Sequence, residues 1–100
     1  MKRSPSSATL KDETLTAESR VVLTELNDGT GLLLHLGSKL YFTLNRSGVL
    51  IWKAIVRGGS TRARLIQQVT DTFDTSAADV ERDLDVLLDE MFSEQLVHVA

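Results

Sequence analysis

Few residues in this sequence of 100 are of the types that make or break covalent bonds. It contains no cysteine, which excludes disulfides, zinc–thiolate sites and iron–sulfur clusters. Nucleophilic catalysis needs a nucleophile, a base and a group that orients the base. His35 is the only histidine in the middle of the chain, and it alternates with leucines as a structural residue of a strand does. Since phosphate-binding glycine loops and HExxH are also missing from the sequence, we expect no enzymatic activity, no metal and no other cofactor.

The distribution of charge argues against a nucleic-acid partner. The net charge is −3, but residues 1–70 carry ten Lys and Arg against five Asp and Glu, whereas residues 71–100 carry Arg82 alone against nine acids. Acidic side chains on a DNA-recognition helix would repel phosphates. The basic residues that precede this acidic part are typical of a solvated face or of a surface for an acidic protein partner: Arg46, Lys53, Arg57, Arg62 and Arg64.

Three short strands are predicted to precede three helices. The strands span Arg20–Leu26, Gly31–Leu36 and Lys39–Leu44, with turn residues at Asn27-Asp28-Gly29 and at Gly37-Ser38. Because turns this short join antiparallel neighbours, the strands should form a meander. The second strand is apolar at nearly every position, which suits the centre of the sheet.

The period of the apolar residues then changes to that of helices. Helices are predicted over Arg46–Arg57, from Ser60 or Thr61 to Phe73, and from Ser76 to about Glu94, with a short final strand at Leu96–Val99. Asn45 and Ser76 are predicted N-caps, and Gly58-Gly59 should end the first helix. The order βββααα predicts an α+β fold, a three-stranded antiparallel meander followed by three helices. The spacing of the last two helices is winged helix-turn-helix-like.

One domain is expected over residues 19–100, because the chain is too short to divide into two. Residues 1–18 lack a sustained apolar period and should form a flexible N-terminal tail. The sequence has no run of 18 apolar residues, so no membrane-spanning helix is predicted. The N-terminal segment MKRSPSSATLKDE lacks the apolar part of a secretory signal. We therefore expect a cytoplasmic protein with neither a membrane nor a nucleic-acid partner.

Two predicted features could bind a partner. Lys39–Leu44 ends the meander, so its edge offers unpaired N–H and C=O groups to an extended peptide, unless its ends or a partner subunit protect it. Tyr41 and Thr43 alternate with apolar residues, and the sequence leaves open which set faces the core. Beside its core stripe the predicted third helix carries Asp79, Asp83, Val86 and Glu90, either as a binding flank or as a solvated face.

The segment from the third strand into the first helix resembles a known family. Residues 39–52, KLYFTLNRSGVLIW, contain the pattern aromatic-x-Leu-Asn-x-x-Gly-x-x-Ile-Trp of the PqqD-like family, which is named for coenzyme PQQ synthesis protein D. The Gly58-Gly59 break, the helix start at Asp79–Leu84 and the close at Leu96-Val97 also match its layout. The resemblance covers about residues 20–99.

This resemblance implies a non-catalytic recognition element for ribosomally synthesised, post-translationally modified peptides. Such domains bind the leader of a precursor peptide as a strand added to their third strand, beside the third helix. They deliver it to a radical SAM protein in the PQQ pathway, or to a leader peptidase and a cyclase in lasso-peptide pathways. Carried over to this chain, the peptide-binding residues would be Lys39, Leu40, Tyr41, Phe42, Thr43, Asp79, Val80, Asp83, Val86 and Leu87. Two alternatives remain, a winged-helix DNA-binding regulator and a general protein–protein adaptor.

Overall fold

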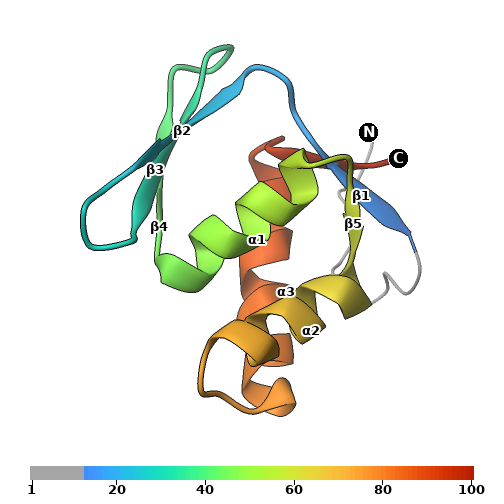
Figure 1. Ribbon diagram of the computed structural model, residues 1–100. Helices are drawn as coiled ribbons and strands as arrows, with labels where there is room; N and C mark the ends of the chain where they lie inside the picture. Colours follow the sequence, from blue (N-terminus) through green and yellow to red (C-terminus); the bar gives the residue numbers. More distant parts are fainter. Residues whose placement is uncertain (1–12) are drawn as a thin grey trace.

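The computed structural model describes residues 13–100, which form two small sheets and three helices (Figure 1). In chain order the elements are β1 Thr14–Ala17, β2 Val21–Glu25, β3 Gly31–His35, β4 Tyr41–Leu44, α1 Arg46–Val56, β5 Ser60–Thr61, α2 Arg62–Thr72, α3 Ala77–Ser93 and β6 Val97–Val99. The meander of β2, β3 and β4 followed by α1, α2 and α3 confirms the predicted α+β fold and the βββααα order. In the second sheet, of order β5-β1-β6, the strand β6 confirms the predicted final strand at Leu96–Val99, whereas β1 and β5 are additions to the predicted elements.

Local hydrogen bonds build the two turns of the meander. Gly29 turns the first hairpin with a φ of 89°, a conformation that side chains rarely adopt. The second turn is held by His35, which is 4% exposed. Its Nδ1 accepts hydrogen bonds from the backbone N–H groups of Gly37 and Ser38, at 3.0 and 3.2 Å. The ring of His35 therefore has a structural role at the end of the sheet.

Side-chain caps set where the helices begin. The N–H of Gly48 donates to Asn45 at 2.8 Å, that of Arg64 donates to Thr61 at 3.3 Å, and that of Asp79 donates to Ser76 at 3.2 Å. Each cap satisfies an N–H group that has no partner within its own helix. The predicted caps Asn45 and Ser76 are thus confirmed.

Residues 14–17 differ from the prediction of a flexible tail over residues 1–18. They form β1, in which Leu15 pairs with Ser60 of β5 and with Val99 of β6 and is fully buried. Gly59 permits the approach of β5, since a Cβ there would lie 2.6 Å from Cγ2 of Thr14. Four residues with one large apolar side chain are too few to show a strand period, and their partners lie far along the chain. Residues 1–12 of the predicted tail lie outside the described residues.

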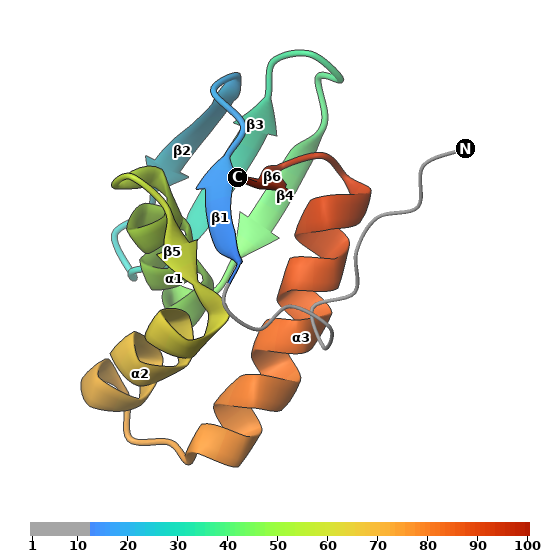
Figure 2. The ribbon, with the colours of Figure 1, turned by 90° about the vertical axis from the view of Figure 1, so that its right-hand side faces the viewer.

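The helix α1 lies between the two sheets (Figures 1 and 2). Trp52, which is 2% exposed, borders Val21 and Leu23 of β2 on one side and Ala17 of β1 on the other. The helices α2 and α3 pack against each other, and α2 also contacts α1. The core is therefore continuous from the meander to α3.

Two contacts join the ends of the described chain. The N–H of Ala100 donates to the C=O of Thr14 at 2.8 Å. Nearby, Nε2 of His98 lies 3.0 Å from the Glu18 carboxylate, which also accepts the backbone N–H of Arg20 at 3.3 Å. The contact with His98, followed by the N–H of Arg20, lowers the pKa of Glu18 to about 2.

We expect Glu18→Gln to flatten the loss of stability in acid. The folded-state pKa of about 2 lies below the ordinary value of 4.5, so ionised Glu18 stabilises the fold above pH 4.5. That contribution is lost as the pH falls from 4.5 towards 2. The thermal midpoint of the wild-type protein should therefore fall more steeply over this interval than that of the variant, and exceed it at neutral pH. Parallel curves of midpoint against pH would contradict this role of Glu18.

Candidate peptide-binding groove

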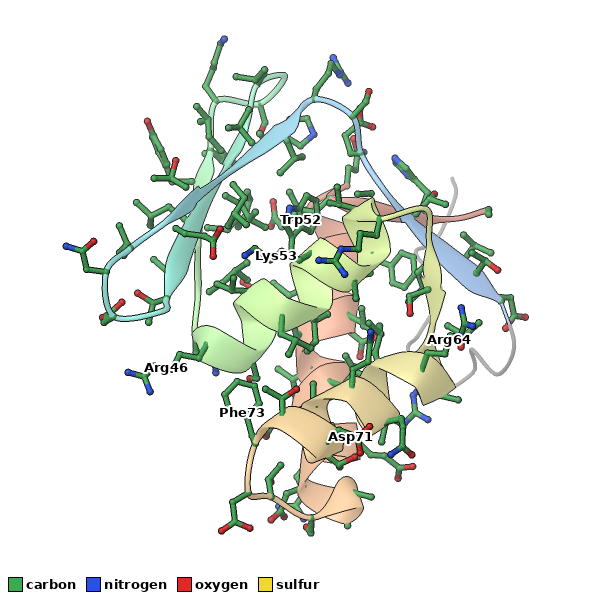
Figure 3. All side chains as sticks on the ribbon, in the orientation of Figure 1. Arg46, Trp52, Lys53, Arg64, Asp71 and Phe73 are labelled. Atoms are coloured by element: carbon green, nitrogen blue, oxygen red, sulfur yellow. The ribbon has the colours of Figure 1, made fainter. Side chains whose placement is uncertain are left out.

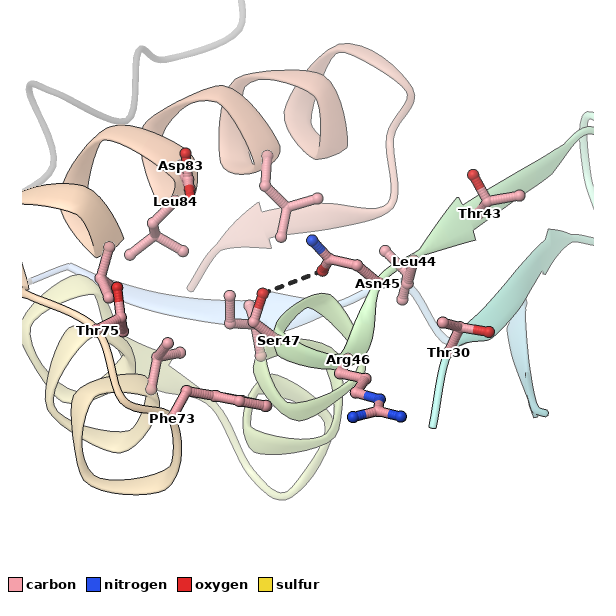
Figure 4. Close-up of a pocket in the computed structure, with 14 residues that line it drawn as sticks. Thr30, Thr43, Leu44, Asn45, Arg46, Ser47, Phe73, Thr75, Asp83 and Leu84 are labelled. Carbon is pink, nitrogen blue, oxygen red and sulfur yellow. Dashed lines mark hydrogen bonds between the residues drawn. The ribbon is translucent and has the colours of Figure 1, made fainter. Parts of the chain in front are cut away.

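A cavity of about 660 Å³ opens between the end of β4, the first turn of α1, the connection from α2 to α3, and α3 itself (Figure 4). Its floor is apolar and consists of Leu44, Ile51, Val69, Val80, Leu84 and Leu87. Its polar lining includes Thr43, Asn45, Arg46, Ser47, Thr75 and Asp83. An apolar floor with a few polar groups around it is typical of a site that buries an apolar part of a ligand.

The strand β4 is an edge strand, and no strand among residues 13–100 pairs with its outer side. The N–H of His35 donates to the C=O of Leu40 at 3.0 Å, and antiparallel pairs alternate along a ladder. The backbone groups of Phe42 and Leu44 therefore point to β3, whereas those of Tyr41 and Thr43 point away from it. The open edge thus offers two N–H and two C=O groups beside the cavity.

The side chains of β4 divide between the two faces of the sheet. Phe42 is half-buried against the core and Leu44 is 5% exposed, whereas Tyr41 and Thr43 are exposed. This settles which set faces the core. Of these residues, Leu44 and Thr43 line the cavity.

The predicted residues Lys39 and Leu40 precede β4. Lys39 has a φ of 64° in the turn, and Leu40 is 51% exposed. Both lie beyond the cavity lining, at the end of the meander. They are placed to contact a guest only if it extends past the start of β4.

The helix α3 lines the groove on the side opposite β4. Val80, Asp83 and Leu87 line the cavity, so with Thr43 it contains four of the ten predicted site residues. Asp79 and Val86 lie outside the lining; Asp79 pairs with Arg82 at 3.5 Å, and Val86 is 66% exposed.

The contribution of α2 to the groove is absent from the sequence prediction. Val69 of α2 lines the cavity, and Phe73 and Thr75, which follow α2, close one end of it (Figure 4). Phe73 packs against the core. This end of α2 borders the groove because of the way α2 and α3 cross. The spacing of residues in the sequence does not predict that crossing. The cap signal at Asn45 does mark the first turn of α1, which forms the adjoining wall.

Opposite charges lie on the two banks of the groove. Asp83 is exposed on α3 and makes no ion pair within the described part of the chain. Arg46 lies across from it on α1, where its Nε donates to the C=O of Asp28 at 2.6 Å. Within the described residues the carboxylate of Asp83 is therefore free of ion pairs on α3, whereas the guanidinium of Arg46 is held beside the first hairpin turn (Figure 4).

The charge on α3 disfavours its use as a DNA-recognition helix. Between residues 76 and 95 it carries seven acids and one arginine, and a duplex approaching this helix would meet like charge. Elsewhere, acids neutralise part of the basic surface, since Arg62 pairs with Asp85 at 2.9 Å and Lys53 with Glu25 at 2.7 Å.

The polar part of the groove lining consists of hydroxyls, an amide, a guanidinium and one carboxylate. Across residues 13–100, no three His, Cys, Asp or Glu side chains lie close enough to hold a metal ion. No helix in this range is both long and apolar enough to cross a bilayer.

Comparison with known proteins gives a family and two similar folds. The profile of the family described as coenzyme PQQ synthesis protein D (PqqD) matches residues 31–97. TbiB1 in complex with the TbiA(beta) leader peptide is 25% identical with a TM-score of 0.72, over 83% of this chain and 94% of that one. Lasso peptide synthetase B1 complexed with the leader peptide is 21% identical with a TM-score of 0.69, over 84% of this chain and 96% of that one. Among curated proteins, none matches the sequence significantly.

The family match runs from the start of β3 to the start of β6, and so includes β4, α3 and every lining residue of the cavity except Thr30. It contains the aromatic-x-Leu-Asn segment at residues 42–45. The two similar structures agree with the fold over nearly their whole length. The chain belongs to the PqqD family.

Proposed function

We propose that this protein is a non-catalytic recognition element that captures the leader of a ribosomally synthesised precursor peptide and presents it to a separate maturation enzyme. The observation that carries the proposal is the open edge of β4 beside an apolar cavity. Membership of the PqqD family and the leader-peptide complexes of both similar structures support it.

The leader would bind as a fourth strand beside β4. The N–H and C=O groups of Tyr41 and Thr43 can make at most four hydrogen bonds with it, each contributing about 0.5–1.5 kcal/mol. Four such bonds amount to less than the roughly 8 kcal/mol of a micromolar complex. Apolar side chains of the leader must therefore supply the rest, at about 1.5–3 kcal/mol for each one buried in the cavity.

The cavity selects which leaders bind. Alternate side chains of an added strand point to the same face, so residues two apart in the leader would face Leu44, Val80 and Leu87. Asp83 favours a leader that carries a Lys or Arg next to the two residues that face the cavity. Lys39, Leu40, Asp79 and Val86 would form the outer contacts of a longer leader.

We take the maturation enzyme to be of the lasso type, a leader peptidase or a cyclase, because both similar structures are B1 proteins with leader peptides. A radical SAM enzyme of the PQQ type is the second candidate, on the family match. Precursors of either kind are made by ribosomes, which places the proposed encounter in the cytoplasm.

The test of strand addition is hydrogen exchange with and without a candidate leader peptide. The amides of Tyr41 and Thr43 should become protected on binding, and those of β2 should change little. Thr43→Pro should weaken binding at least tenfold, because it removes an outward N–H and leaves the ladder with β3 intact. Thr43→Val keeps the N–H and should bind nearly as the wild-type protein does. New protection confined to α1 and α2 would refute strand addition to β4.

A second prediction concerns Asp83. Exposed ion pairs are worth about 0–1 kcal/mol and are screened by salt. Asp83→Lys should therefore weaken the binding of a basic leader only severalfold, mainly through slower association. Glu81→Lys makes the same charge change on the other side of α3 and should have a smaller effect. Equal effects of the two substitutions in a kinetic titration would show that Asp83 has no special position.

The third prediction concerns delivery. The protein should turn over nothing alone, and it should raise the rate at which the maturation enzyme acts on a full-length precursor. It should have little effect on the same core peptide without its leader. Equal stimulation of both substrates would favour a general adaptor, and tight binding of duplex DNA would favour a regulator.

A further inference from the structure

The outer face of the meander carries no charged side chain within its strands. Strand alternation and the register place six side chains on it in two rows, Val22–Leu34–Tyr41 and Thr24–Leu32–Thr43. The inner face carries residues such as Leu33, which is fully buried. Sheets with one face in water usually alternate apolar and polar residues, and large exposed apolar patches mark interaction sites.

No part of residues 13–100 covers this outer face. The helices lie on the other side of the sheet (Figures 1 and 3), and Val22, Leu32, Leu34 and Tyr41 are all outside the core cluster. Val22 is 47% exposed and Tyr41 is 67% exposed. Leu36, which follows β3, is 42% exposed and extends the apolar surface towards the second turn.

We infer that this outer face is an interface with a second copy of the chain. In a two-fold dimer the same rows would pack on each other, apolar on apolar, as the facing sheets of a sandwich do. An uncharged face can meet itself without opposing like charges. Two copies of the exposed face of α3 would instead bring many carboxylates together.

The size of the face sets the strength expected of this dimer. Three strands about 4.8 Å apart and five residues long, at about 3.3 Å per residue, give roughly 230 Å² of sheet per copy. Side-chain relief enlarges the accessible area, but the face remains smaller than the roughly 800 Å² per partner of a stable interface. The dimer should therefore be weak and depend on protein concentration.

Dimerisation through this face leaves the backbone edge of β4 open, and Thr43 is the one residue that the face shares with the cavity lining. The outward N–H and C=O groups of Tyr41 and Thr43 lie in the plane of the sheet, so a second sheet stacked on its face does not occupy them. If the proposed function holds, a leader added to β4 would widen the face to four strands on each copy. Leader binding and dimerisation would then strengthen each other.

Sedimentation equilibrium of the full chain without any leader tests the interface independently of the proposed function. Between roughly 10 µM and 1 mM the average mass should rise from 11.0 kDa towards twice that value. The rise should persist in high salt, because the contact is apolar. Val22→Glu should weaken self-association at least tenfold. Val86→Glu, at a valine of 66% exposure on α3, should leave it unchanged.

Circular dichroism and the thermal midpoint verify that each variant is folded. If Val22→Glu does not fold, Thr24→Glu serves as a second variant on the same face. A mass of 11.0 kDa at every concentration would overturn the inference and assign the face to a partner of different sequence. Self-association that salt abolishes, or that Val86→Glu abolishes and Val22→Glu does not, would overturn it equally.

Discussion

The burial of α1 between two sheets is the interaction on which the rest of the structure depends. Trp52 and its neighbours border β2 on one side and β1 on the other, so neither small sheet has to stabilise itself. A three-stranded meander with one covered face needs such a helix. The same helix begins at Asn45, directly after β4, and its first turn forms a wall of the groove. One packed element therefore both stabilises the domain and positions the open edge.

An open edge is ordinarily a risk, because it can pair with any extended chain. Here the edge is four residues long and the acidic bank of α3 lies across the cavity from it. A guest must therefore fit the cavity as well as the edge. On the proposed function, this combination separates one peptide from the many that could add a strand.

The sequence predicts those parts of the fold that depend on neighbouring residues. The meander follows from its short turns, and the helix starts follow from caps such as Asn45 and Ser76. The strand β1 could not be predicted, because one apolar residue, Leu15, has no local period and its partners lie near Ser60 and Val99. The groove was predicted in part for the same reason. Asp83 follows from helical spacing and Leu87 from the family resemblance, whereas Phe73 enters the lining only when α2 and α3 pack together.

The hydrogen bond between Ala100 and Thr14 has a consequence for how this domain could be combined with others. Because it holds the two ends of the described fold together, on the far side of α1 from β4 (Figure 1), the domain could be inserted into a surface loop of a larger enzyme with little strain. The groove would still face outwards. Such a tether would raise the effective concentration of a bound peptide at the enzyme to the millimolar range, without any new contact. The fold is thus compatible with a separate protein and with a built-in module.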